Sequence, residues 1–144
     1  MNKIYSICLV VLQIASIMYL AITGDLIPSN KLLLTGEIIF ILFGFWAMAE
    51  MKFRFNIFPS LLNNSTLITS GPFKFVRHPM YTSTILITLT WLANEFSYLR
   101  LCAWILLVII LNIKTLYEEK ILDKEFSDYK TYRSKTRKLI PFIY

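Results

Sequence analysis

Charged residues are scarce in this sequence, and histidine is scarcer still. Of its 144 residues only 17% are charged while 56% are hydrophobic, and the chain has a single histidine, His78. This composition excludes an ordinary soluble domain and indicates a membrane protein. The two cysteines, Cys8 and Cys102, both lie inside apolar stretches. The sequence therefore predicts neither a disulfide nor a metal site.

Long runs without charge make up most of the chain. A helix needs about 20 apolar residues to cross a hydrocarbon layer of roughly 30 Å. We therefore predict one all-α membrane domain over residues 1–144, with four transmembrane helices at approximately residues 4–23, 32–49, 80–96 and 98–116. The third is the weakest, because its apolar core of about 14 residues rises only about 21 Å as a helix. A secretory signal peptide is the alternative for the first, but that run is long for one and no small-residue cleavage site follows it.

Basic residues fall almost entirely on one side of these four spans. Lys31 and Arg100 are the exceptions among the 15 Lys and Arg residues. By the positive-inside rule, the basic side is the cytoplasm. We expect a multi-pass protein of the cell membrane with both termini, the loop 50–79 and the C-terminal tail in the cytoplasm. The net charge of +6 is explained by this rule and by attraction to anionic lipid, and no basic motif predicts binding of nucleic acid.

After the fourth span the pattern becomes amphipathic. Apolar and aromatic residues recur at spacings that cover one side of a helix, at Ile121, Leu122, Phe126, Tyr129 and Tyr132. We predict an amphipathic cytoplasmic helix over residues 117–133 whose apolar face rests on the bundle or on the lipid surface. The tail that follows, SKTRKLIPFIY, is basic and then apolar, which indicates that it packs back against the protein.

Polar residues also occur inside the second and third spans. Glu37 lies in the second span, and Gly44 follows seven residues later on the same helix face. An acid within a span is costly and usually faces an interior. Glu37 also lies near the outer end of its span, where it could instead reach water. An acid in this span is also compatible with a homodimer. Small hydroxyl residues in the third span are more typical of helix packing than of ligand binding: Ser83, Thr84, Thr88 and Thr90.

Two polar clusters should meet at the cytoplasmic side. Arg77, His78 and Tyr81 precede or begin the third span, and Glu118 and Glu119 follow the fourth. Because these two spans form a tight hairpin, the clusters should be neighbours, and together they suit a polar ligand that carries both signs of charge. Adjacent helical residues diverge by about 100°, so one acid should bind the ligand while the other pairs with the arginine or a lysine. Taken one by one, each residue could instead be an ordinary anchor or a solvated surface group.

The segments around these clusters resemble a known family. LITSGPFKFVRHPMYTSTIL, followed by YEEKILDKEFSDYKTYRSKTRKLIPFI, is similar to the isoprenylcysteine carboxyl methyltransferase family and its phospholipid methyltransferase relatives. The family signature is R-H-P-x-Y-x-G and then E-E-x-x-L, and the resemblance covers roughly residues 67–142. One position departs from it, because Ser83 stands where the family has its final glycine. A small residue is kept there, but a backbone conformation that needs glycine would be lost.

The resemblance implies a methyltransferase that uses S-adenosylmethionine. The donor's α-ammonium suits Glu118 or Glu119, and its carboxylate suits Arg77 or His78. A proton acceptor is needed only if the methyl acceptor is an amine, and His78 and Tyr81 are the candidates for that role. The resemblance thus implies catalytic roles for Arg77, His78 and Tyr81. It implies cofactor binding by His78, Pro79, Tyr81, Ser83, Glu118 and Glu119.

The methyl acceptor should be a lipid or a hydrophobic small molecule, because a site between spans can be reached sideways from the bilayer. Prenylated cysteine, phosphatidylethanolamine, a fatty acid and a small thiol all fit. Two other functions fit part of the pattern. A non-catalytic lipid-binding or scaffold protein would hold anionic lipid on its basic face. A nicotinamide-dependent membrane reductase would share a related helical arrangement, although such reductases are longer and have more spans.

Overall fold

The computed structural model describes residues 3–52 and 67–140, and every regular element in these two ranges is a helix. The expected all-α fold class is thus confirmed for this part of the chain. The elements are α1 (Lys3–Ile22), α2 (Lys31–Glu50), the short 3₁₀ helix η1 (Gly71–Lys74), α3 (Pro79–Asn94), α4 (Tyr98–Glu125) and α5 (Tyr129–Lys135).

Three of these helices are long and apolar enough to cross a membrane, namely α1 from Ile4 to Ile22, α2 and α4. They correspond to the first, second and fourth predicted spans, which are confirmed in this sense. The third, predicted at 80–96, is the 16-residue helix α3, which rises about 24 Å and is too short for a complete crossing of roughly 30 Å. Four full spans are therefore not confirmed.

Side chains near the helix starts explain where three of the helices begin. The Asn30 side chain accepts hydrogen bonds from the first free N–H groups of α2, and Ser97 Oγ accepts one from the Arg100 N–H of α4. Pro79 opens α3, where the missing N–H of proline costs nothing. Asn30 and Ser97 lie at the ends of the short connections between α1 and α2 and between α3 and α4.

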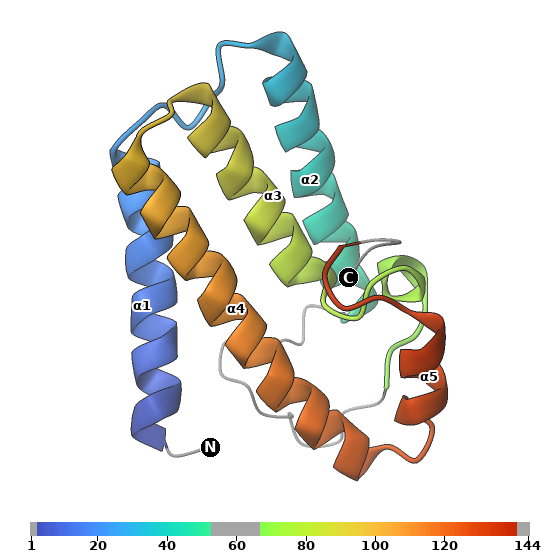
Figure 1. Cartoon of the computed structure of the whole chain (residues 1–144). Helices are drawn as coiled ribbons and strands as arrows, with labels where there is room; N and C mark the ends of the chain where they lie inside the picture. The colour runs from blue at the N-terminus through green and yellow to red at the C-terminus, as the bar shows by residue number, and fades with distance from the viewer. Residues whose placement is uncertain (1–2, 53–66, 141–144) are drawn as a thin grey trace.

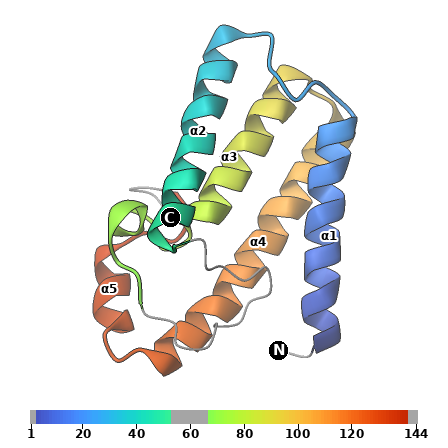
Figure 2. The same ribbon diagram turned by 180° about the vertical axis from the view of Figure 1, so that it is seen from behind.

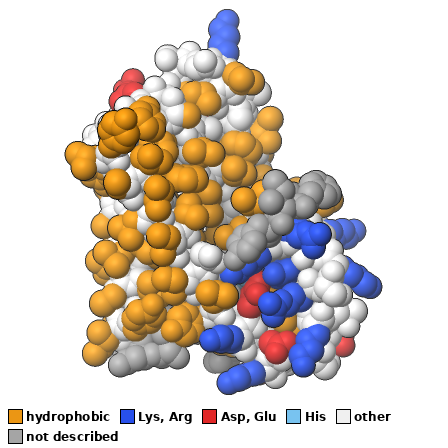
Figure 3. Space-filling view, viewed as in Figure 1, with side chains coloured by type: hydrophobic (Ala, Val, Ile, Leu, Met, Phe, Trp, Pro, Cys, Tyr) orange, Lys and Arg blue, Asp and Glu red, His pale blue; other side chains and the backbone are white. Residues whose placement is uncertain are grey.

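The helices pack as two pairs (Figures 1 and 2). Helix α2 lies along α3, and α1 lies along α4, while α3 and α4 join the two pairs. A small buried cluster of Leu20, Leu107 and Leu111 holds α1 to α4. Many large apolar side chains face outward on all of the long helices, and the space-filling view shows them covering most of the bundle (Figure 3). An outer surface of this kind suits contact with lipid tails.

Helices α2 and α3 approach closely through the polar residues noted in the sequence. A Cβ added at Gly44 would lie 2.5 Å from Ser83 Oγ, so any side chain there would displace the Ser83 hydroxyl. Ser83 Oγ donates a 2.7 Å hydrogen bond to the Phe40 carbonyl. Glu37 is buried and accepts a 2.9 Å hydrogen bond from Trp91 Nε1. Of the two alternatives for Glu37, the interior position is the one observed.

The separate helix predicted over 117–133 is wrong in its boundaries. Helix α4 runs without interruption to Glu125, and only the seven residues of α5 form a second helix. The backbone turns extended at Phe126, which ends α4. A helix has no reason to stop where a bilayer surface begins, because its backbone hydrogen bonds are internal on either side of that surface. Residues 117–125 contain no glycine or proline to break it.

The two ends of the bundle differ in character. One end carries residues 71–81, helix α5 and the last two turns of α4, and we call it the charged end. We call the opposite end, with the short connections 23–30 and 95–97, the loop end. In Figure 3, Lys, Arg, Asp and Glu side chains gather at the lower right, over α5 and the end of α4. The clusters singled out in the sequence all lie at the charged end.

Candidate functional site

The C-terminal tail packs against the segment that precedes α3. The Arg77 N–H donates to the Arg137 carbonyl at 2.8 Å, and the His78 N–H donates to the Lys138 carbonyl at 3.2 Å. In return, the Arg137 N–H donates to the Phe75 carbonyl at 3.2 Å. These bonds form a short parallel bridge. The expectation that the tail packs back is confirmed for its described part, and the tail is brought next to the arginine and histidine of the signature.

The segment before α3 is held by the end of α2. Gly71 has a φ of +55°, a conformation that side chains disfavour. A Cβ there would also lie 2.5 Å from Glu50 Oε1. Ser70 Oγ donates to the other oxygen of Glu50 at 2.8 Å. Pro72 and Phe73 are buried beneath, so the whole turn has one fixed position from which the next residues project.

Arg77 is buried and makes three hydrogen bonds from one guanidinium. Its Nε donates to Glu119 Oε1 at 2.7 Å, and its Nη1 donates to the Thr136 carbonyl at 2.6 Å and to the Arg133 carbonyl at 3.3 Å. The exposed fractions of the Arg77 and Glu119 side chains are 8% and 6%. The expected pairing of one acid with Arg77 is confirmed, and the acid is Glu119.

His78 lies between the two adjacent acids. Its Nδ1 is 3.3 Å from Glu118 Oε2, and its Nε2 is 3.5 Å from Glu119 Oε1, although the second contact lacks hydrogen-bond alignment. Burial by itself would lower the pKa of His78, but the two carboxylates outweigh it and raise the pKa above 6.5. The two carboxylates thus favour the protonated form of the ring, which lies between them and links them.

Tyr81 and Glu118 form the second arm of the cluster. The Tyr81 hydroxyl donates a hydrogen bond to Glu118 Oε1. The Tyr81 ring stacks on the ring of His78, with centroids 5.8 Å apart and an angle of 14° between the planes. The Glu118 side chain is 21% exposed, more than that of Glu119. The signature residues thus form one continuous network, as the hairpin argument predicts.

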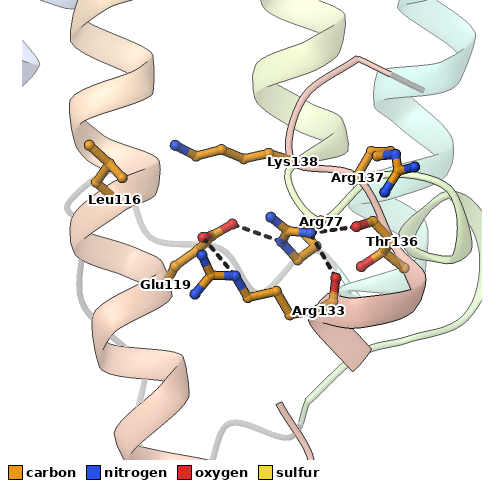
Figure 4. Close-up of a pocket in the computed structure, with 7 residues that line it drawn as sticks. All are labelled: Arg77, Leu116, Glu119, Arg133, Thr136, Arg137 and Lys138. Carbon is orange, nitrogen blue, oxygen red and sulfur yellow. Dashed lines mark hydrogen bonds and ion pairs between the residues drawn. The ribbon is translucent and has the colours of Figure 1, made fainter. Parts of the chain in front are cut away.

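A cavity of about 380 Å³ opens beside this network (Figure 4). Among the described residues that line it, Glu119 is the only acid, and it faces basic side chains from α5 and the tail. The Nε of Arg133 lies 3.9 Å from Glu119 Oε2, and Lys138 crosses toward α4, where its Nζ donates to Asn112 Oδ1 at 2.6 Å. The lining residues are Arg77, Leu116, Glu119, Arg133, Thr136, Arg137 and Lys138.

The predicted site residues occupy four kinds of position. Arg77 and Glu119 line the cavity, His78 contacts Glu119 from behind, and Tyr81 and Glu118 contact His78. Pro79 is fully buried at the first position of α3, where its ring fixes the backbone at the start of the helix. Ser83 is not brought to the cavity, because its hydroxyl points to α2.

Sequence reasoning did not identify the tail residues as part of the site. Thr136, Arg137 and Lys138 of the tail line the cavity together with Arg133 of α5. The run SKTRK before LIP is the signal that could have found them. A basic run inside a tail that folds back must lie against something, and here it lies against the segment before α3 and against Asn112 of α4.

The chain matches the model of the isoprenylcysteine carboxyl methyltransferase (ICMT) family over residues 32–126, about two thirds of its length. The chain belongs to the isoprenylcysteine carboxyl methyltransferase family. The resemblance stated from the signature residues is thereby confirmed. Three apolar helices and membership of this family fit a multi-pass membrane protein. No curated protein and no solved structure matches the chain.

The matched residues cover α2, α3 and most of the site, but not all of it. Arg77, His78, Tyr81 and both acids lie within 32–126. Helix α1 and the tail from 127 onward lie outside. Part of the cavity wall, from Arg133 to Lys138, thus lies beyond the residues that match the family.

Proposed function

We propose that this protein transfers a methyl group from S-adenosylmethionine to a lipidic or hydrophobic acceptor at the cytoplasmic surface of the membrane. The observation that carries the proposal is Glu119. It is a buried carboxylate in the wall of a cavity, next to Arg77 and His78, in a chain of a methyltransferase family. A carboxylate so placed is a partner for a cationic ligand that reaches the cavity.

The residues around the cavity fit this donor by their chemistry. S-adenosylmethionine carries an ammonium and a carboxylate on one carbon, and the cavity offers Glu119 for the first and the cations Arg133 and Lys138 for the second. Its volume of about 380 Å³ falls in the range of roughly 300–1,000 Å³ that is usual for small-molecule pockets. When bound, the donor supplies an electrophilic methyl group on a sulfonium.

The chain's own residues would hold the reacting groups in position and would not transfer protons. Arg77 and His78 hold Glu119, and Tyr81 holds Glu118, so both acids keep one orientation. Methyl transfer from a sulfonium depends on alignment of the nucleophile and on exclusion of water. The role of Arg77, His78 and Tyr81 would be to maintain this alignment. Pro79 fixes the start of α3.

The surroundings of His78 and Tyr81 bear on the acceptor. Both ring nitrogens of His78 already face carboxylates, and the Tyr81 hydroxyl already donates to Glu118. Neither residue is therefore arranged as a base. This favours an acceptor whose nucleophile is already deprotonated, a carboxylate or a thiolate, over an amine.

The short helix α3 gives the acceptor a route to the site. With a rise of about 24 Å, α3 cannot span the hydrocarbon layer. We infer that α3 begins, at the charged end of the bundle, below the lipid headgroups. The site then lies within reach of a molecule that enters from the bilayer. Both termini then lie in the cytoplasm, as the basic residues indicate.

The test is donor binding by purified protein in detergent, measured by calorimetry. We expect Glu119→Gln to raise the Kd for S-adenosylmethionine at least about tenfold, because a charge-assisted contact is lost. Glu125→Gln is the matched control, since that acid is exposed on the same helix. Labelled donor and native membranes then identify the methylated product.

Two results would overturn the proposal. One is wild-type protein that binds no S-adenosylmethionine, and the other is a Glu119→Gln variant that stays folded and binds as the wild type does. Binding of a nicotinamide cofactor in place of the donor would point to the reductase alternative. Binding of anionic lipid alone, with no labelled product, would point to a non-catalytic lipid-binding protein.

A further inference from the structure

A lysine is fully buried inside the bundle, close to the site. Lys114 belongs to α4, and its side chain has no exposed surface. By sequence it stands at the end of a span, where a lysine would ordinarily extend to the headgroups. A buried charge in a membrane-spanning helix is costly and usually marks a functional contact. Its partners therefore indicate what it does.

Two of those partners come from different helices. Lys114 Nζ donates a 2.7 Å hydrogen bond to Gln13 Oε1 of α1. The same ammonium lies 5.4 Å from the centroid of the Tyr81 ring, in cation–π geometry. Lys114 thus connects α1, α3 and α4 at one point.

The Tyr81 ring is the link between this lysine and the site. It contacts the Lys114 ammonium, it stacks on His78, and its hydroxyl donates to Glu118. Glu118 lies one helical turn after Lys114, so both project from the same face of α4. The position of Tyr81, and with it the orientation of Glu118, depends on the cation.

Packing alone does not explain a lysine here. Methionine has a similar length and would fill the same space without the cost of removing a charge from water. What methionine lacks is the positive charge that attracts the face of the tyrosine ring and the amine that bonds to Gln13. The positive charge of Lys114, rather than its volume, therefore explains why a lysine stands here.

We propose that Lys114, held by Gln13, is a positioning residue that fixes Tyr81 and, through its contacts with Glu118 and His78, the Glu119 carboxylate for donor binding. The inference rests on the proposed function, and it adds α1 to the site. Helix α1 lies outside the residues that match the family. Through Gln13, this chain braces the signature residues from a helix that the signature does not contain.

The experiment compares two replacements of the same lysine. We expect Lys114→Met to raise the Kd and the KM for S-adenosylmethionine roughly tenfold with a smaller change in kcat, and Lys114→Arg to restore most of the affinity, since a cation over an aromatic ring is retained. Gln13→Leu should have an intermediate effect. Lys124→Met, at an exposed position of α4, is the matched control. A role in packing alone predicts the opposite order, with methionine tolerated and arginine harmful.

A second readout does not depend on the donor. In protein with ¹³C-labelled tyrosine, the Tyr81 signal, assigned with Tyr81→Phe, should shift in Lys114→Met and stay in place in Lys124→Met. An unmoved signal would overturn the inference even if the wild type binds no donor. If the wild type binds the donor and Lys114→Met binds it equally well, the inference fails while the proposed function stands. Gln13→Leu and Lys114→Arg keep the test decisive if the methionine variant does not fold.

Discussion

Each end of the bundle contains a buried arginine, and the two are held in different ways. At the loop end, Arg100 is 3% exposed and donates from Nη1 to the Leu20 carbonyl and the Thr23 hydroxyl, and from Nη2 to the Trp91 carbonyl. At the charged end, Arg77 donates to the Glu119 carboxylate as well as to carbonyls. One arginine is bound by neutral groups alone, and the other shares an acid.

The neutral partners of Arg100 suit a structural role. The carbonyls that it binds lie in the last turns of α1 and α3, where helices leave carbonyl groups without partners and carry partial negative charge. A single guanidinium therefore ties the ends of two helices together. Within the described residues Arg100 has no ion pair, so nothing at the loop end competes for it.

The acid beside Arg77 is shared with other side chains. Glu119 also lies near His78 Nε2 and Arg133 Nε. Three side chains thus share one carboxylate, and under the proposed function a ligand's ammonium would share it too. The comparison teaches that the arginine bound by carbonyls ties two helix ends together, whereas the other arginine orients a carboxylate that has further partners.

The largest effect should follow from Arg77→Met. Removing one partner of a buried pair leaves Glu119 short of a cation, which we expect to cost about 3–5 kcal/mol of unfolding free energy. Donor affinity should fall with it, since Glu119 loses its fixed orientation. Denaturant titration in detergent and calorimetry measure the two quantities. A variant that keeps both wild-type values would end the distinction drawn between the arginines.

A smaller and purely structural effect should follow from Arg100→Met. Three oxygen acceptors lose their donor, and we expect about 1–3 kcal/mol of lost unfolding free energy. The Kd for S-adenosylmethionine should stay within about twofold of the wild type, because the two ends do not share partners. The same pair of measurements applies. Weakened donor binding in a folded Arg100→Met protein would contradict the prediction.

The smallest effect should appear as a pH dependence confined to the charged end. The pKa of His78 is raised above 6.5 in the folded protein, so its charge stabilises the fold fully below about pH 6.5 and loses that effect as pH rises through the folded pKa. Glu118, Glu119 and Arg77 are the charged groups that surround it.

The check is the unfolding free energy of the wild type relative to His78→Gln across this pH range. The difference should shrink as pH rises. The loss of unfolding free energy in Arg100→Met should stay constant over the same pH range, because none of the groups that bind Arg100 titrates there. A difference between wild type and His78→Gln that grows with pH would show that the ring is neutral in the fold.

Much of the site was predictable because its signals are local. Apolar runs predicted the long helices, and the short turn between the third and fourth runs forces their far ends together. Arg77 and Glu119 therefore had to be neighbours, whatever the remaining contacts are. The departure at Ser83 was also visible in the sequence, but its meaning was not, because it faces Gly44 on another helix.

The sequence by itself determined that this protein is helical, apolar on the outside and charged at one end, and that a histidine and two acids meet there. Only the tertiary structure decided that Lys114 faces inward, that Ser83 packs on α2 and that the tail forms a wall of the cavity. Periodicity and hydropathy follow from each segment alone, whereas the direction of a side chain depends on how each helix is rotated against its neighbours. That rotation is set by contacts between residues far apart in the chain, such as Gln13 with Lys114.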